Sequence, residues 1–304
     1  MARSYAVSAM KNGVLLALLA YATFSWGDAC IKASRGGMSV FQTGFLVTLA
    51  AAIFLYFVHG PEERWRDFWR TKRPWMVQAR ALSGCGAGIL GVYAFTTIPM
   101  AEAYSLIFLS PFFVTILSIL ILKEQIGPWR WGAVIAGFAG VLLVVRPGFR
   151  ELSTGHLAAL GIAFLAGTTV ILLRSLSQSE KRTTILGVMI LYALIINGIG
   201  AVISGITMPS GRDLALVLAA GAFSAMGQVL MLKAMKLAPA NQVAPTQYSQ
   251  IAWAAAIGAA LFGERPDALA IVGLVIVTMA GLLTVLREQW KFGTLRNPWG
   301  RNRL

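Results

Sequence analysis

The feature that most constrains this chain is a succession of ten apolar runs, which follow one another along nearly its whole length. A helix that crosses the hydrocarbon core of a bilayer needs about 20 predominantly apolar residues, because each residue adds only about 1.5 Å of length. The runs predict ten transmembrane helices at Gly13–Ile31, Ser39–His59, Met76–Ile98, Ala101–Leu122, Trp131–Val145, Gly155–Leu173, Thr184–Ile206, Leu214–Leu232, Val243–Phe262 and Ala268–Leu286. We therefore predict an all-α integral membrane protein.

The small share of charged residues argues against a water-soluble fold. Charged residues make up 12% and hydrophobic residues 57% of the 304 residues, whereas an ordinary soluble domain carries about 25% charged residues. The net charge of +14 would suggest a nucleic-acid partner in a soluble protein. Here the basic residues stand between the apolar runs and in the C-terminal tail, so we expect a lipid bilayer as partner and no nucleic acid. Cys30 and Cys85 fall in apolar runs without metal-like spacing, and no disulfide framework, metal or other cofactor is expected.

The placement of the basic residues between the runs predicts the orientation. With a cytoplasmic N-terminus, 20 of the 26 Lys and Arg residues fall on the cytoplasmic side. The other six are Lys32, Arg35, Arg146, Arg150, Arg212 and Arg265. Because basic residues are enriched in cytoplasmic loops, we predict that both termini are cytoplasmic, as a short segment at residues 1–12 and a basic tail at 288–304. No small-residue cleavage signature is present, so the first helix is expected to be uncleaved.

A weak internal repeat divides the chain into two halves. An offset of 140 residues pairs Ala94 with Ala234, Pro99 with Pro239 and Glu124 with Glu264, and one extra loop residue continues the register to Gly140 and Gly281. Each half, 13–150 and 151–287, then holds five predicted helices. Since five is odd, the second half enters the membrane from the opposite side, which makes an inverted repeat. Inverted repeats are typical of secondary transporters, whose substrate site lies near the bilayer midplane between the halves.

The same features carry a resemblance to a known family. Residues 98–103 read IPMAEA and residues 238–243 read APANQV, and Lys123-Glu124 and Gly263-Glu264 follow the fourth and ninth runs. With ten short helices in two halves, residues 13 to 287 resemble the drug/metabolite transporter superfamily, EamA type, and within it the bacterial YddG-type exporters of aromatic and other amino acids. The resemblance implies a basket of helices around a central cavity in a bacterial inner membrane, with the fifth and tenth helices on the outside.

Polar and aromatic side chains inside the runs are the candidates for substrate binding. A zwitterionic ligand needs amide or hydroxyl partners for its charged ends and an apolar or aromatic surface for the rest. The predicted cavity residues are Trp26, Tyr93, Tyr104, Gln228, Gln247, Tyr248, Gln250 and Trp253. The alternative for each amide and hydroxyl is a structural hydrogen bond between helices, worth about 0.6 kcal/mol. Pro111, near the centre of the fourth run, predicts a kink that acts as a hinge or shapes the cavity.

Carboxylates inside the membrane would indicate coupling to an ion gradient. The acidic residues near the ends of runs are Asp28, Glu102, Glu124 and Glu264. Asp28 and Lys32 are four residues apart, which predicts a local ion pair on one helix face. Glu124 and Glu264 are interpreted as solvated caps or partners of a neighbouring basic residue. No P-loop sequence is present, so energy for transport would come from a gradient, either by facilitated diffusion or by proton antiport.

The sequence thus predicts a secondary transporter, not an enzyme, that exports amino acids or similar small metabolites by alternating access, as a monomer. Two alternatives stay open. An exporter of cationic drugs or other metabolites would be favoured by an unpaired acidic residue in the cavity, and the sequence indicates none. An integral membrane lipid-modifying enzyme would need clustered Asp, His or Glu at one interface, whereas the histidines, His59 and His156, are isolated in the sequence.

Overall fold

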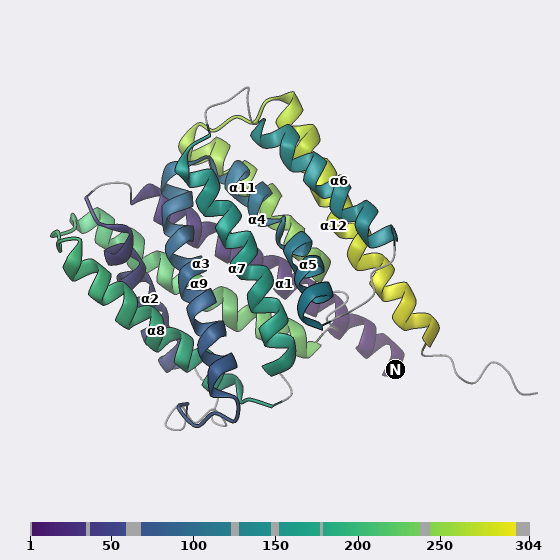
Figure 1. Cartoon of the computed structure of the whole chain (residues 1–304), viewed down its shortest axis with the longest axis horizontal. Helices are drawn as coiled ribbons and strands as arrows, with labels where there is room; N and C mark the ends of the chain where they lie inside the picture. Colours follow the sequence, from purple (N-terminus) through teal and green to yellow (C-terminus); the bar gives the residue numbers. More distant parts are fainter. Residues whose placement is uncertain are drawn as a thin grey trace, which may run out of the picture.

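A computed structural model describes residues 2–34, 37–58, 68–122, 128–146, 152–176, 179–237 and 244–295. Within these ranges the chain is helical and has no β-strand. The elements are α1 (Ala2–Ala33), α2 (Val40–Val58), α3 (Pro74–Thr97), α4 (Met100–Ile107), α5 (Ser110–Leu122), α6 (Pro128–Val145), α7 (Thr154–Leu176), α8 (Arg182–Ile203), α9 (Gly211–Leu237), the 3₁₀ helix η2 (Ala244–Tyr248), α11 (Ser249–Phe262) and α12 (Ala268–Leu295); most are labelled in Figure 1.

These helices match the ten predicted spans when α4 with α5, and η2 with α11, are each counted as one span. In the described ranges, six helical stretches are long and apolar enough to cross a membrane by length and composition. Two shorter apolar stretches, Trp131–Val145 and Ala268–Leu283, lie in α6 and α12. Helices α1 and α12 run past their predicted ends, to Ala2 and Leu295 respectively. The predicted helix ends His59 and Val243 lie outside the described residues.

Two of the predicted spans are interrupted at equivalent places. In the fourth span, α4 ends at Ile107 and α5 begins at Ser110, directly before Pro111. Proline lacks an N–H and its ring collides with the preceding turn, so the helix is broken here. In the ninth span, the chain begins as η2, which contains Pro245, and continues as α11 from Ser249.

The packing between helices repeats when the two halves are exchanged. Helix α1 packs on α9, and its equivalent α7 packs on α3; likewise α2 packs on α9 and α8 on α3. In the pairs α2–α8, α4–α11 and α6–α12, each helix packs on its own equivalent in the other half. Helix α1 starts at one end of the bundle and α7 at the other (Figure 1). The protein is therefore built from two inverted five-helix repeats, as the sequence predicted.

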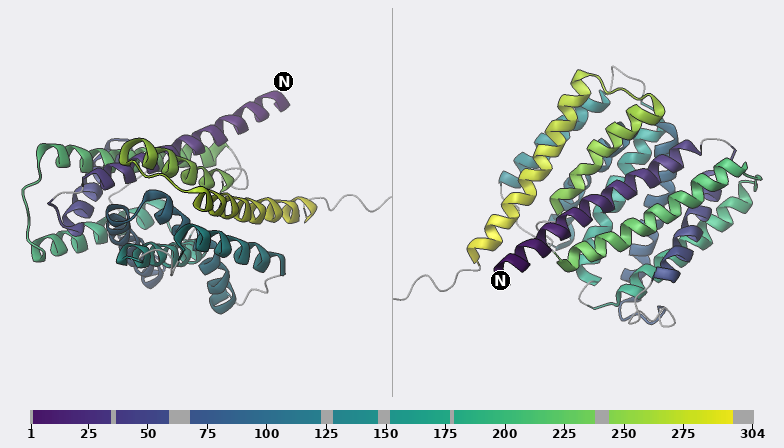
Figure 2. Two further views of the ribbon diagram at one scale, coloured as in Figure 1. Left: turned by 90° about the horizontal axis from the view of Figure 1, so that it is seen from above. Right: turned by 180° about the vertical axis from the view of Figure 1, so that it is seen from behind.

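The helices form two layers that each mix the halves. Helices α3, α4, α5, α6 and α7 lie in one layer, and α1, α9, α11 and α12 in the other, with α2 and α8 at one edge (Figures 1 and 2). The α6–α12 pair lies at the opposite edge, where the resemblance placed the fifth and tenth helices. A Cβ on Gly140 would come within 2.8 Å of the Gly273 carbonyl oxygen. Glycine at this crossing lets the two backbones approach closely.

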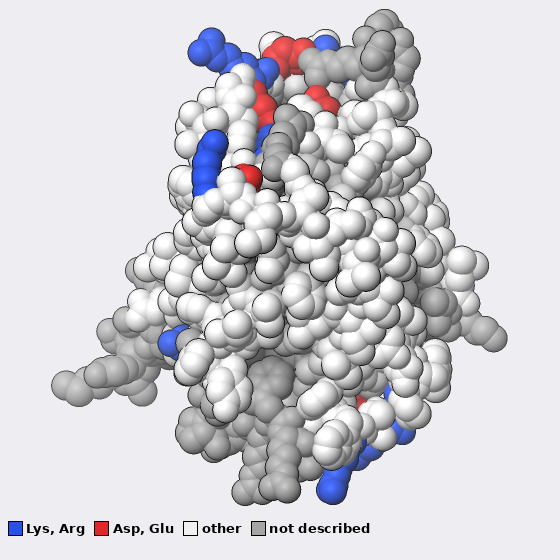
Figure 3. Space-filling view, turned by 90° about the vertical axis from the view of Figure 1, so that its left-hand side faces the viewer, with Lys and Arg blue, Asp and Glu red and all other residues white. Residues whose placement is uncertain are grey.

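The surface fits a membrane environment. Charged side chains gather toward the two ends of the bundle, with a broad uncharged belt between them (Figure 3). Large apolar side chains such as Phe57, Ile199 and Ile203 are exposed, as expected where lipid is the solvent. We name the two ends of the bundle after one residue each. The Glu264 end carries the α3–α4 and α11–α12 turns, and the Glu180 end carries the loop between α7 and α8.

Candidate functional site

A cavity of about 360 Å³ lies between α1, α2, α3, α8 and α9, and thus between helices of both halves. Its α3 wall contains Gly84, Gly88 and Gly91. A Cβ on Gly88 or Gly91 would meet no atom within 4 Å, so at these two positions glycine leaves the cavity open. The volume falls in the range of small-molecule sites, which are mostly apolar with a few polar groups.

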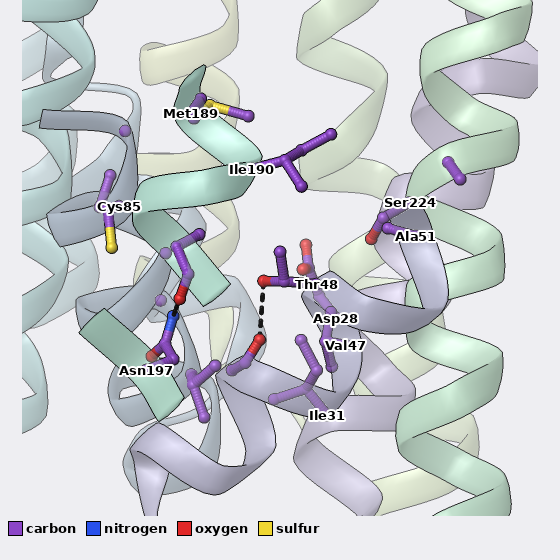
Figure 4. Close-up of a pocket in the computed structure, with 18 of the residues that line it drawn as sticks. Asp28, Ile31, Val47, Thr48, Ala51, Cys85, Met189, Ile190, Asn197 and Ser224 are labelled. Atoms are coloured by element: carbon purple, nitrogen blue, oxygen red, sulfur yellow. Dashed lines mark hydrogen bonds between the residues drawn. The ribbon is translucent and has the colours of Figure 1, made fainter. Parts of the chain in front are cut away.

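The polar groups of this cavity come from four helices. The lining includes Asp28 of α1, Thr48 of α2, Asn197 of α8, and Ser224 and Gln228 of α9; the first four are labelled in Figure 4. Gln228 is one of the predicted cavity residues. Thr48, Asn197 and Ser224 were not predicted, because a hydroxyl or amide in an apolar run looks the same in sequence whether it faces a neighbouring helix or a cavity.

Asn197 is a cavity-lining residue with an unsatisfied hydrogen-bond acceptor. Its Nδ2 donates to the Ala193 carbonyl oxygen at 2.8 Å, and because a carbonyl oxygen can only accept, this bond identifies which side-chain atom is Oδ1. Oδ1 is buried and has no hydrogen-bond partner in the described part of the chain, and the residue is only 4% exposed. Oδ1 faces Gly44 of α2, where an added Cβ would come within 2.7 Å of it. Buried polar atoms are rarely left unsatisfied, so the packing of α2 and α8 leaves an unusual polar group in this wall.

Asp28 does not pair with Lys32, contrary to the sequence prediction. Its carboxylate accepts a short hydrogen bond from the Tyr104 hydroxyl, which also lies 3.5 Å from Gln250 Nε2. No Lys, Arg or His is within ion-pair distance of Asp28 among the described residues. The predicted absence of an unpaired acidic residue in the cavity is therefore wrong. The spacing of four residues was misleading because tertiary contacts offered Lys32 a better-placed partner.

That partner is Glu264, which follows α11. Lys32 Nζ lies 2.7 Å from Glu264 Oε1 and donates to the Ile98 carbonyl oxygen at 2.7 Å. Glu264 Oε2 accepts from the Met100 backbone N–H at 2.9 Å. The two charged side chains are 4% and 17% exposed. One ion pair thus joins α1, the α3–α4 turn and the α11–α12 turn at the Glu264 end.

Two further polar contacts between the halves lie at this end. His156 Nε2 is 3.0 Å from Glu102 Oε2, and the Tyr93 hydroxyl is 2.5 Å from Thr154 Oγ1. Both join the start of α7 to the α3–α4 region. His156, which the sequence left without a clear role, therefore has an acidic partner that is far away in the sequence. Glu124, the counterpart of Glu264 in the repeat, lies outside the described residues.

Arg80 of α3 is a buried cation, one helical turn before the cavity-lining Gly84. It is 9% exposed, and its Nη1 lies 3.0 Å from the sulfur of Met189, a cavity-lining residue. Its Nε has no hydrogen-bond partner, and no carboxylate is within ion-pair distance of it in the part of the chain that the structure describes. In the sequence, Arg80 lies near the end of an apolar run and was therefore interpreted only as one of the cytoplasmic-side charges.

Three of the predicted residues lie at a second cavity. This space of about 300 Å³, bounded by α5, α6, α7, η2 and α12, is lined in part by Gln247, Tyr248 and Pro111. The rings of Phe108 and Tyr248 stack at 5.2 Å between centroids, and Phe108 in turn stacks on Tyr104 at 6.3 Å. This aromatic row connects the second cavity to the tyrosine that binds Asp28.

The remaining predicted residues do not line either cavity. Tyr104 and Gln250 stand behind Asp28, and Tyr93 bonds to Thr154 as described above. Trp26 and Trp253 are 41% and 38% exposed. The structure thus brings Tyr104, Gln228 and Gln250 to the central cavity or its wall, and places the others elsewhere. The described residues contain no group of three or more His, Cys, Asp or Glu that could hold a metal ion.

Comparisons with known proteins identify relatives of this architecture. The model of the EamA-like transporter family matches residues 11–146 and again residues 153–286. A pseudopaline exporter, CntI, of Pseudomonas aeruginosa is 30% identical over 275 residues, 89% of this chain and 95% of that protein. A riboflavin transporter of Rhizobium johnstonii is 30% identical over 222 residues, 72% of each chain. An S-adenosylmethionine uptake transporter of Rickettsia prowazekii is 25% identical over 287 residues, 93% of this chain and 96% of that protein.

A solved crystal structure has the same fold at low sequence identity. It covers 93% of this chain and 99% of its own, with a TM-score of 0.63 and 17% identity. The relatives reported above carry different small molecules and do not single out the amino-acid exporters that the sequence resemblance favoured. What the relatives share is membrane transport of small molecules. The two matched halves, the inverted packing and these relatives show that the chain belongs to the EamA-like transporter family.

Proposed function

We propose that this protein is a secondary transporter that exports amino acids or similar small metabolites across a bacterial inner membrane by alternating access. Both termini lie in the cytoplasm in this proposal, so the Glu264 end faces outward, and one chain is sufficient for transport. The observation that carries the proposal is the central cavity between two inverted halves, with apolar walls and a few polar groups. Alternating access follows when such halves rock around a fixed midplane site.

The predicted polar residues have distinct roles in this proposal. Gln228 contacts the substrate directly, because it lines the cavity. Tyr104 and Gln250 hold Asp28 in position through the phenol hydroxyl. Gln247, Tyr248 and Pro111 lie where the fourth span is broken, and Pro111 acts as the hinge there, while Trp26, Tyr93 and Trp253 extend the substrate path.

A second candidate, export of cationic drugs or other cationic metabolites, is favoured by a specific observation. Asp28 lines the cavity and has no cationic partner among the described residues. An uncompensated carboxylate in an apolar site binds a cation more favourably than a neutral molecule. A transport assay must therefore include both amino acids and simple cations.

Counterflow into proteoliposomes tests the function. Vesicles containing the full chain are preloaded with an unlabelled compound, and entry of its labelled form is followed across a panel of amino acids and cationic drugs, with and without a pH gradient. We expect saturable exchange for at least one amino acid, and no exchange in protein-free vesicles. Exchange confined to cationic drugs would favour the second candidate, and no exchange for any compound would refute transport of both classes.

Variants then locate the path. We expect Gln228→Ala and Gln247→Ala to reduce the exchange rate at unchanged membrane abundance. Thr278→Ala is a matched control, because its hydroxyl donates to the Leu274 carbonyl oxygen of its own helix at 2.8 Å. If Gln228→Ala exchanges at the rate of the unmodified chain, the central cavity is not the substrate site.

A further inference from the structure

The central cavity is elongated, and its two ends have opposite electrostatic character. Along α3 its lining runs from Gly84 to Phe95, which at 1.5 Å per residue is about 16 Å. Asp28 belongs to the Phe95 end, because its partner Tyr104 packs against Phe95 at 5.4 Å between ring centroids. Arg80 stands one helical turn before Gly84, at the other end.

Two side-chain hydrogen-bond acceptors, on Asp28 and Asn197, lie toward the Asp28 end of the cavity. The Asp28 carboxylate accepts from Tyr104 and has no cation, and the Oδ1 atom of Asn197 has no donor in the described structure. Asn197 lies eight residues beyond Met189 along α8, toward this end. An ammonium group has three donors and no acceptor, and it would compensate the charge of the Asp28 carboxylate.

The Arg80 end presents a donor that lacks an acceptor. The guanidinium contacts the soft sulfur of Met189, which is a weak acceptor, and its Nε is unsatisfied. Both Met189 and Gly84 line the cavity, and Nη1 would lie 3.9 Å from a Cβ on Gly84. Met189 is unbranched and flexible, and in the proposal below its side chain turns aside so that the guanidinium faces the cavity. A carboxylate is the group that best fits a guanidinium.

We propose that the cavity selects elongated substrates that carry an ammonium group at one end and a carboxylate at the other, held by Asp28 and by Arg80 respectively. This inference rests on the proposed transport function and specifies its substrate class. Simple α-amino acids carry their two charges too close together to reach both ends, so they engage one end at a time. Neither Asp28 nor Arg80 has a charged protein partner in the described residues, so the substrate itself supplies the compensating charges.

Binding of ω-amino carboxylic acids to the detergent-solubilised full chain tests this inference. The probes run from glycine through 4-aminobutyrate, 6-aminohexanoate and 8-aminooctanoate to 11-aminoundecanoate, with octylamine and octanoate as single-charge controls, and affinity is measured by titration calorimetry. We expect the affinity to peak at an intermediate or long member, and to exceed that of either single-charge control. If no member of the series binds more tightly than octylamine and octanoate, the binding is apolar alone and the proposal is overturned.

Two charge-removing variants should separate the two ends. Asp28→Asn should weaken binding of octylamine and of the amino acids by about tenfold, the value of one charge-assisted hydrogen bond, and leave octanoate unchanged. Arg80→Gln should do the reverse, and Arg80→Lys, which keeps the charge, should retain part of the octanoate affinity. Asp213→Asn and Arg265→Gln, at the Glu264 end outside the cavity, are matched controls that should bind like the unmodified chain.

The outcomes distinguish the substrate class from the transport function. Equal losses for amine and carboxylate probes in both variants, with monodisperse protein, would contradict separate ends. Counterflow of an amino acid together with no length optimum would keep the transport function and reject this inference. If each variant weakens only its own class of probe but no flux is measured, the binding site stands and the transport function is rejected.

Discussion

The Lys32–Glu264 pair should be a strong determinant of the conformation described here. At 2.7 Å, two unit charges attract by about 6 kcal/mol at an effective dielectric constant of about 20. Desolvation offsets part of this, and removal of one partner from a buried pair costs about 3–5 kcal/mol, because the other charge stays buried without compensation. Glu264→Gln should therefore destabilise the joined arrangement of α1 and the two turns by about this amount, which shifts its equilibrium with any state that lacks these contacts more than about 100-fold.

Unfolding in mixed detergent micelles and hydrogen exchange measure the effect. Glu264→Gln and Lys32→Met should each lower the free energy of unfolding by about 3 kcal/mol or more, and exchange of the amides around Met100 should accelerate, since Glu264 also binds that N–H. The double variant should lose clearly less than the two single losses added together, because the pair is already absent in each single variant.

A matched control is available at the same end. Arg146 and Asp267 also form an ion pair, but their side chains are 20% and 43% exposed. Arg146→Gln should cost no more than about 1 kcal/mol, as is usual for solvent-exposed pairs. If the coupling energy of Lys32 and Glu264 is as small as that of the exposed pair, burial does not strengthen this contact and the argument fails.

Two other substitutions probe the packing and a loop. Gly281→Ala should lower the melting temperature in detergent, because its Cβ would overlap the phenol of Tyr248 and overpacking costs about 1–3 kcal/mol. The control Gly132→Ala, whose Cβ would meet nothing within 4 Å, should be neutral or slightly stabilising. Equal effects of the two substitutions would contradict the packing described. Glu180→Ala should speed hydrogen exchange just before α3 and leave α12 unchanged, since Glu180 Oε1 accepts from the Arg73 backbone N–H at 2.6 Å; unchanged exchange would show that this contact does not order the loop.

The course of the chain could be read largely from its sequence, because the bilayer restricts the solutions. Apolar runs of helix length can only span as helices, since every backbone N–H and C=O must be satisfied internally. The break before Pro111 was predictable for a similarly local reason, the missing donor and the ring of proline. The inverted repeat followed from an odd number of spans in each half, and the exchange-symmetric packing agrees with it.

The partners of the charged side chains were decided by the tertiary structure alone. In the sequence, Asp28 and Lys32 stand one helical turn apart and predict each other as partners. In the fold, Lys32 pairs with Glu264, which is distant in the sequence, and Asp28 binds the Tyr104 hydroxyl and lines the cavity. Arg80 likewise changed from an orienting charge to a buried cation beside Met189. Periodicity determines which residues share a helix face. Only the packing of the ten helices determines which residues each face contacts, and the proposed substrate site is formed by these contacts between helices.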